Sequence, residues 1–129
     1  MSYIKYNPNP LNLSVGDCVI RAISKVTGMS WKETYLELII EGYAMADMPS
    51  ANRVWARLLN RFGYIQRLLP RNCPACYTVK DFCIENPIGK FVVATGDHVV
   101  AVINGDYYDS WDSGNELLSY YFEKENRRR

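Results

Sequence analysis

The most constraining feature of the sequence is an Asn-Gly pair, Asn104-Gly105, between two segments rich in Val, Ile and Tyr. Such a pair is the strongest short signal for a two-residue β-hairpin turn, because both residues tolerate positive φ. Residues 98–103 and 106–111 are therefore expected to pair as antiparallel strands. A third segment of the same character, 90–95, precedes them. This part of the chain is expected to form an antiparallel meander.

Ahead of the meander, start signals and apolar stripes predict four helices. In the first helix, Arg21, Ser24 and Lys25 are expected to face outward. Residues 1–13 are expected to form an extended arm or loop, and residues 64–69 a short strand. The expected N-caps and stops of the four helices are, in order, Asp17 and Gly28, Ser30 and Gly42, Ser50 and Gly63, and Thr78 and Pro87.

Helices followed by strands indicate an α+β fold, with N-terminal helices packed on a C-terminal antiparallel β-sheet. A length of 129 residues fits a single domain, 1–129. The net charge of +1 gives no global attraction to nucleic acid or to an anionic membrane. The first residues lack the apolar stretch of a signal peptide, and no run approaches the ~18 apolar residues of a membrane-spanning helix. The expected compartment is the cytoplasm, with neither nucleic acid nor membrane as partner.

The chain contains one histidine, His98, so any histidine-dependent chemistry must use it. Cys18 lies in the first turn of the first expected helix, where free backbone N–H groups and the helix dipole lower the pKa of a thiol. Because the thiolate is the nucleophilic form, Cys18 and His98 are the candidate nucleophile and base. Each also has a plainer interpretation, Cys18 as a small core residue and His98 as a core histidine with a satisfied hydrogen bond.

The expected hairpin also selects a carboxylate for the histidine. A two-residue turn pairs His98 with Trp111 and Val100 with Asp109, and directly opposed residues share a face. Asp109 is then diagonal to His98, at about 7–8 Å between backbones, which long side chains can bridge. Parity thus favours Asp109 over the other nearby aspartates. A three-residue turn would reverse this choice, since a one-residue slip moves every side chain to the other face.

A base oriented by a carboxylate and facing a thiol at a helix start is the arrangement of acyl-transfer enzymes. Such a site also needs hydrogen-bond donors for the oxyanion. The backbone N–H of Cys18 is one candidate, because it is free at the helix start. The side-chain amide of Asn12 is the nearest second candidate, and an asparagine that only shapes a loop is the alternative.

These residues resemble the papain-like cysteine peptidase superfamily, including the double-glycine leader peptidases of bacterial transporters. In that superfamily the cysteine begins the central helix, an amide side chain six positions earlier helps to bind the oxyanion, and the histidine follows much later on a strand. Cys18, Asn12 and His98 occupy matching places. The segment D109SW resembles the Asn-Ser-Trp segment of the family, which implies that Asp109 orients the histidine and that Trp111 shields their hydrogen bond.

The resemblance implies a papain-like cysteine proteinase fold and a thiol hydrolase that cleaves a peptide, isopeptide or related amide bond. Its partner would be a peptide or protein substrate, and no cofactor is expected. The alternative is a catalytically silent papain-like domain that binds protein, which the shorter amide of Asn12 and the small chain favour. Nothing in the sequence indicates the oligomeric state.

The other three cysteines suggest a third possibility. Cys73 and Cys76 form a Cys-x-x-Cys pair, and Cys83 follows seven residues later. Zinc prefers four ligands, so a site built on these thiols would need a carboxylate or a partner chain to complete it. The plainer interpretation, that Cys73 and Cys76 are loop thiols and Cys83 is buried on the fourth helix, predicts no metal.

Overall fold

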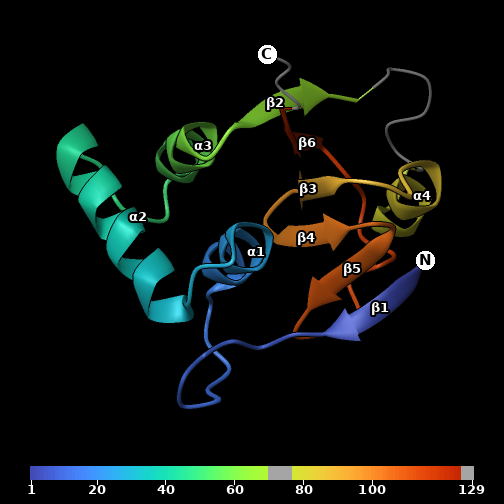
Figure 1. Ribbon diagram of the computed structural model, residues 1–129, viewed down its shortest axis with the longest axis horizontal. Helices are drawn as coiled ribbons and strands as arrows, with labels where there is room; N and C mark the ends of the chain where they lie inside the picture. The colour runs from blue at the N-terminus through green and yellow to red at the C-terminus, as the bar shows by residue number, and fades with distance from the viewer. Residues whose placement is uncertain (70–76, 126–129) are drawn as a thin grey trace.

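The computed structural model describes residues 1–69 and 77–125, and within these ranges the fold is α+β. Four helices and a mixed six-stranded sheet are present in the described ranges (Figure 1). In chain order the elements are β1 (Ser2–Lys5), α1 (Cys18–Thr27), α2 (Trp31–Met45), α3 (Asn52–Arg61), β2 (Tyr64–Leu68), α4 (Val79–Glu85), β3 (Lys90–Ala94), β4 (Val99–Ile103), β5 (Asp106–Asp109) and β6 (Tyr120–Lys124).

The sheet has the strand order β1-β5-β4-β3-β6-β2. The expected meander is confirmed: β3 pairs with β4 and β4 with β5, both antiparallel. The turn between β4 and β5 has positive φ at both central residues, 50° at Asn104 and 80° at Gly105. Ile103 therefore pairs with Asp106, the register on which the choice of Asp109 depended.

The expectation of an antiparallel C-terminal sheet is wrong in one respect. Residues 1–13 are not wholly arm or loop, because β1 lies within them and pairs in parallel with β5. The partner of Tyr3 is Tyr107, so the pairing joins segments about a hundred residues apart. Local sequence patterns carry no information on a partner at that distance.

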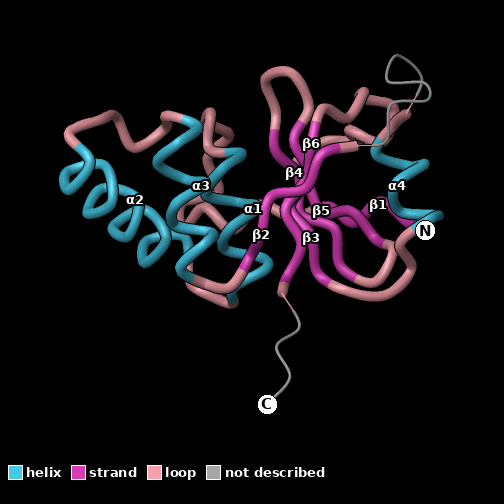
Figure 2. The backbone as a smooth tube through the Cα atoms, turned by 90° about the horizontal axis from the view of Figure 1, so that it is seen from above, coloured by secondary structure: helices cyan, strands magenta, loops and turns pink. Residues whose placement is uncertain are grey.

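Helices cover both faces of the sheet (Figure 2). Helices α1, α2 and α3 lie on one face, and α4 lies on the other. The strands alternate accordingly, with Val92 in the core beside α1–α3 and its neighbour Val93 in the core beside α4. Both cores exclude water almost fully. The first contains Ala22, Ile23, Val54, Trp55, Leu58 and Phe122, among others, and the second Val79, Phe82, Cys83, Val100 and Tyr107.

Two of the four expected N-caps are confirmed in full. The side chains of Ser30 and Thr78 each accept a hydrogen bond from the backbone N–H three residues later, as the first halves of capping boxes. Asp17 occupies the N-cap position of α1, but its side chain makes no capping bond. The prediction that Ser50 caps α3 is wrong. The helix begins one residue later than expected, with Ala51 at the N-cap position and no side-chain capping bond.

Gly42 does not end α2, contrary to expectation. The helix continues to Met45, and the Asp47 N–H then donates to the Gly42 carbonyl. A Cβ on Gly42 would lie 2.8 Å from the Asp47 carbonyl oxygen. The glycine is therefore required by the close approach of the returning chain rather than by a stop.

Within the described residues, none of the helices has the length and apolar character needed to cross a membrane.

Candidate active site

Cys18 is the first residue of α1 and lies at the edge of the core beneath that helix. Its thiol is half-buried and free of any disulfide. The backbone N–H groups of the first turn of a helix have no carbonyl partner within the helix. They present partial positive charge, which favours a thiolate over a thiol.

His98 directly precedes β4, and its imidazole lies close enough to the Cys18 thiol for each group to shift the pKa of the other. The backbone N–H of Val99 also lies near the sulfur and helps to lower the pKa of the thiol. Two contacts fix the backbone of the histidine, since the N–H and the hydroxyl of Thr95 both donate to the His98 carbonyl, at 2.8 and 3.2 Å. The base is thus held at the end of the β3–β4 hairpin, facing the start of α1.

Asp109, the last residue of β5, lies on the far side of the imidazole. Its Oδ2 is 2.6 Å from His98 Nε2 and accepts a second hydrogen bond, also 2.6 Å, from the Ser113 hydroxyl. Its Oδ1 accepts from the Ser110 N–H at 2.8 Å and from Arg21 Nη2 at 2.9 Å. The carboxylate is only 1% exposed, so these four donors replace the water that it has lost.

Trp111 lies beside the imidazole, with ring centroids 4.9 Å apart and an angle of 34° between the planes. The indole is 46% exposed, so one side faces solvent while the other covers His98. Trp111 therefore covers one side of the His98 ring.

The three titratable groups perturb one another strongly. Burial raises the pKa of the Cys18 thiol, but the hydrogen bonds from His98 and Val99 and the nearby positive charges outweigh it, so the net pKa is lowered. Burial likewise lowers the pKa of His98, and the hydrogen bonds to Asp109 and Cys18 outweigh it, raising the pKa to about 9. The pKa of Asp109 is lowered, because its hydrogen bonds with His98 and Ser113 outweigh the effect of burial. Each shift favours the charged form of the group.

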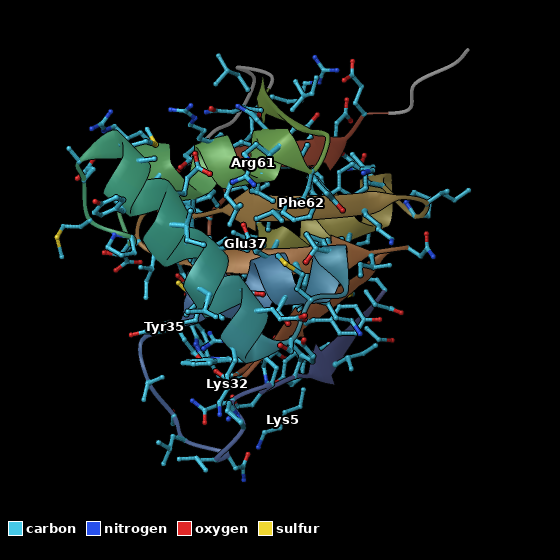
Figure 3. The ribbon with its side chains drawn as sticks, turned by 60° about the vertical axis from the view of Figure 1, so that its left-hand side comes forward. Lys5, Lys32, Tyr35, Glu37, Arg61 and Phe62 are labelled. Carbon is cyan, nitrogen blue, oxygen red and sulfur yellow. The ribbon has the colours of Figure 1, made fainter. Side chains whose placement is uncertain are left out.

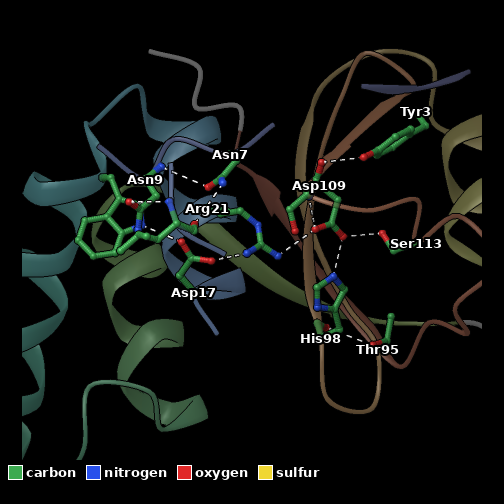
Figure 4. A network of polar contacts seen from close by, with 12 residues as sticks. Tyr3, Asn7, Asn9, Asp17, Arg21, Thr95, His98, Asp109 and Ser113 are labelled. Carbon is green, nitrogen blue, oxygen red and sulfur yellow. Dashed lines mark hydrogen bonds and ion pairs between the residues drawn. The ribbon is translucent and has the colours of Figure 1, made fainter. Parts of the chain in front are cut away.

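Sequence reasoning missed the residue that joins α1 to this group. Arg21 was expected to face outward, and it is instead only 6% exposed. Its guanidinium binds two carboxylates, Asp17 through Nη1 and Asp109 through Nη2 (Figure 4). The expected outward position of Ser24 is also wrong, since this side chain is buried and bonded to the Tyr6 hydroxyl at 2.8 Å. Both residues sit on the polar side of the helical stripe, and the stripe alone gives no sign that Tyr6 of the expected arm covers Ser24 or that Asp109 binds Arg21.

Asn12 is not brought into this group. It is exposed in the loop before α1, has a φ of 58°, and its backbone N–H donates to the Asn9 carbonyl at 2.9 Å. It is absent from the described residues that line the cleft beside the thiol. The geometry around Asn12 is that of a loop turn.

The cleft beside Cys18 and His98 has a volume of about 500 Å³. One wall is the first turn of α1, another is α2, and the floor is formed by α3 and the sheet. Its lining is mainly apolar and aromatic. The side chains that give this character are Val19, Ile20, Leu38, Ile39, Trp55 and Tyr120. Tyr35, which stands at the outer side of α2, completes this wall (Figure 3).

Within residues 1–69 and 77–125, no cluster of three or more His, Cys, Asp or Glu side chains is suited to a metal. Cys83 is buried on α4, as expected, and burial raises the pKa of its thiol to about 11. Cys73 and Cys76 lie outside the described residues.

Comparison with known proteins gives no match, whether with protein-family models, with curated proteins or with solved structures.

Proposed function

We propose that the protein is a papain-like thiol hydrolase that cleaves a peptide, isopeptide or related amide bond. Cys18 is the nucleophile, His98 the general base and acid, and Asp109 the residue that orients the imidazole. The observation that carries the proposal is the placement of His98 at the edge of an open cleft, bound to Asp109 at 2.6 Å and close enough to the Cys18 thiol for each group to shift the pKa of the other. Nucleophile, base and orienting acid in this order are the parts that acyl transfer requires.

A papain-like fold is part of the same proposal. Its support is the placement of the cysteine at the start of a helix that packs on an antiparallel hairpin, with the histidine before one strand and the acid at the end of the next. The His98 to Asp109 distance of 2.6 Å and the adjacent Trp111 ring add to that support.

In the proposed reaction the Cys18 thiolate attacks the substrate carbonyl carbon and forms a carbon–sulfur bond. As the tetrahedral intermediate collapses, the carbon–nitrogen bond breaks and the His98 imidazolium gives its proton to the leaving amine. A water molecule then attacks the thioester while His98 takes one of its protons. The carbon–sulfur bond breaks, the acid leaves, and the thiol and imidazole are restored.

The oxyanion of the intermediate needs donors close to the thiol. In this proposal they are backbone N–H groups of the first turn of α1, at Cys18 and Val19, which line the cleft. The expected contribution of Asn12 has no contact to support it, so we assign the oxyanion to the backbone.

The cleft also suggests the substrate. An apolar and aromatic lining of about 500 Å³ suits a peptide with a bulky apolar side chain next to the bond that is cleaved. A thiol nucleophile must stay reduced, which the cytoplasm ensures, so we propose that compartment as its place of action.

The test is acylation by the p-nitrophenyl ester of an N-acetylated aromatic amino acid, followed by rapid acid quench and peptide mass spectrometry. The expected result is an acyl adduct on Cys18, release of one equivalent of p-nitrophenol in a burst, and steady turnover afterwards. Cys18→Ser should abolish the adduct. Cys83→Ser is the matched control, since it removes the other described thiol and should leave the adduct intact.

Absence of an adduct on Cys18 would overturn the proposal, as would an adduct formed equally by His98→Ala. An adduct without later hydrolysis would also overturn it, because the protein would then transfer or hold an acyl group rather than hydrolyse it. Binding of peptides with no adduct would support the silent binding domain instead.

A further inference from the structure

Arg21 links the nucleophile and the acid of the site through one helix. It lies three residues after Cys18 on α1, almost one helical turn away, and its Nη2 is 2.9 Å from Asp109 Oδ1. Asp109 Oδ2 binds His98, whose imidazole lies beside the Cys18 thiol. A path of neighbouring groups therefore leaves α1 at Cys18 and returns to it at Arg21 (Figure 4 shows the part from Arg21 to His98).

The other nitrogen of the Arg21 guanidinium, Nη1, also forms an ion pair. It binds Asp17 Oδ1, and Asp17 Oδ2 accepts a 2.8 Å hydrogen bond from the Trp31 indole at the start of α2. The guanidinium therefore has carboxylates on two sides and almost no exposure to solvent. Arginine suits this place because its planar fork can bind two acids at fixed angles, whereas lysine offers a single point charge.

We propose that Arg21 is the positioning residue of the site, holding the Asp109 carboxylate from the helix that carries Cys18 and thereby keeping His98 in line with the thiol. The inference rests on the proposed function, because it concerns the alignment of the same thiol and imidazole. It goes beyond that function in assigning the alignment to a residue that touches neither the cleft nor the reacting atoms.

The geometry of Asp109 explains why the effect should reach the thiol. The two oxygens of one rigid carboxylate divide their contacts, with Arg21 on Oδ1 and His98 on Oδ2. Rotation of the carboxylate about its bond would break both. Ser110 and Ser113 each hold one oxygen as well, but both belong to the segment that follows Asp109 and cannot fix it relative to α1.

The test measures how the rate of Cys18 alkylation by iodoacetamide depends on pH, with peptide mass spectrometry to separate Cys18 from the other thiols. The main variant is the pair Asp17→Asn with Arg21→Gln, which removes one buried charge of each sign, so Asp17 is not left as an unpaired carboxylate. Asp109 loses Arg21 but keeps His98, the Ser110 N–H and Ser113 as donors. Arg21→Lys keeps the positive charge but loses the planar guanidinium that can bind two carboxylates at once. Circular dichroism and cooperative urea unfolding establish that each variant folds.

The matched control is Arg61→Gln. Arg61 binds another buried carboxylate, that of Glu41, and also lies 3.6 Å from Glu37 across α2 and α3 (Figure 3). This variant weakens an ion pair to a buried carboxylate away from the cleft, although the Arg61 side chain is itself half-exposed and Glu41 keeps Arg57. It therefore reports on the loss of an arginine without lost alignment.

In the double variant we expect the alkylation midpoint of Cys18 to rise by about one pH unit and the rate at pH 6 to fall about tenfold. Arg21→Lys should lie between the double variant and wild type, and Arg61→Gln should match wild type. A folded double variant with the wild-type midpoint overturns the inference, and so does Arg21→Lys with the wild-type midpoint, since charge alone would then suffice. If the double variant does not fold, Arg21→Lys decides by the same criterion.

These readouts separate the two proposals, because alkylation needs no substrate. If Cys18 of the wild type titrates as an ordinary thiol, the proposed function and the role of Arg21 fail together. If the wild-type midpoint is low and the variants share it, the role of Arg21 fails alone.

Discussion

His98 Nε2 and Asp109 Oδ2 lie 2.6 Å apart, across the hairpin that Asn104 and Gly105 close. Since the imidazole binds Asp109 through Nε2, its other nitrogen, Nδ1, is the one left to contact Cys18. The acid therefore sets the orientation of the ring as well as its charge. A single histidine makes this relationship directly measurable.

The first prediction concerns the protonation of that histidine. Its pKa is raised to about 9, because the hydrogen bonds to Asp109 and Cys18 outweigh burial. The chemical shift of the imidazole Hε1 proton, observed by NMR, should titrate with a midpoint near pH 9 in the wild type. In Asp109→Asn the midpoint should move toward pH 6.5, because the asparagine side chain carries no charge. Since the chain has one histidine, the signal needs no assignment. A wild-type midpoint at or below 6.5 would contradict the site described above.

The second prediction concerns stability at alkaline pH, in a Cys18→Ser variant that removes the coupled thiol. A histidine whose pKa is higher in the folded than in the unfolded state stabilises the fold fully below about pH 6.5. This stabilisation is lost as the pH rises through the pKa of the histidine in the folded state. The free energy of unfolding in urea should therefore fall between about pH 6.5 and the raised pKa. Adding His98→Ala should remove this decline, and an unchanged decline would assign it to other groups.

The third prediction concerns Asp109 as a structural centre. Asp109→Ala leaves His98 and Ser113 without their acceptor and removes one of the two carboxylates that bind Arg21, and loss of one partner of a buried ion pair costs about 3–5 kcal/mol. Asp109→Asn keeps the shape and an acceptor oxygen, so it should cost less, about 1–3 kcal/mol. Urea unfolding measures both. Equal, small losses in the two variants would show that the carboxylate is not needed for the fold.

The fourth prediction concerns the indole over the imidazole. Trp111→Ala should change the free energy of unfolding by less than about 1 kcal/mol, because nearly half of the side chain is exposed. It should lower kcat/KM on an aromatic ester about tenfold, since water then reaches the hydrogen bond between His98 and Asp109. Trp111→Phe keeps a ring and should recover most of the rate. An Ala variant as fast as wild type would exclude a shielding role.

The fifth prediction concerns the glycine inside α2. Alanine in a helix is ordinarily favoured over glycine by about 1 kcal/mol. At Gly42 the added Cβ would meet the Asp47 carbonyl oxygen at 2.8 Å, a backbone atom that cannot move aside cheaply. Gly42→Ala should therefore destabilise the protein, by about 1–3 kcal/mol in urea unfolding. Gly96→Ala, where nothing lies within 4 Å, is the control and should change stability little.

Local signals predicted the parts of the fold that short-range physics decides. The capping boxes at Ser30 and Thr78 and the turn at Asn104 each involve contacts within a few residues, and all three are present. The register of the hairpin followed from its turn, from Ile103 with Asp106 to Ala101 with Tyr108. Asp109 and His98 lie just beyond these pairs and meet through their side chains.

Long-range contacts were not predictable in the same way. Arg21 follows the polar positions of its helix, and only the strand β1 and the arm after it, together with Asp109, turn that side into an interior. The partner that makes an arginine buried lies 88 residues away, where no periodicity reaches. The same holds for Asp17, whose side chain binds Arg21 and Trp31 instead of capping α1.

The parallel strand β1 has a consequence for when the site can exist. Lys5 pairs with Asp109, the Tyr6 N–H donates to the Asp109 carbonyl at 2.8 Å, and the Tyr3 hydroxyl donates to the same oxygen at 3.2 Å. Closing so long a loop is slow, and during translation it must wait for the residues around 109 to leave the ribosome. The thiol at the start of α1 is made about ninety residues before its acid partner, so a nascent chain carries Cys18 as an ordinary, unaligned cysteine until the residues around 109 have been made and have left the ribosome.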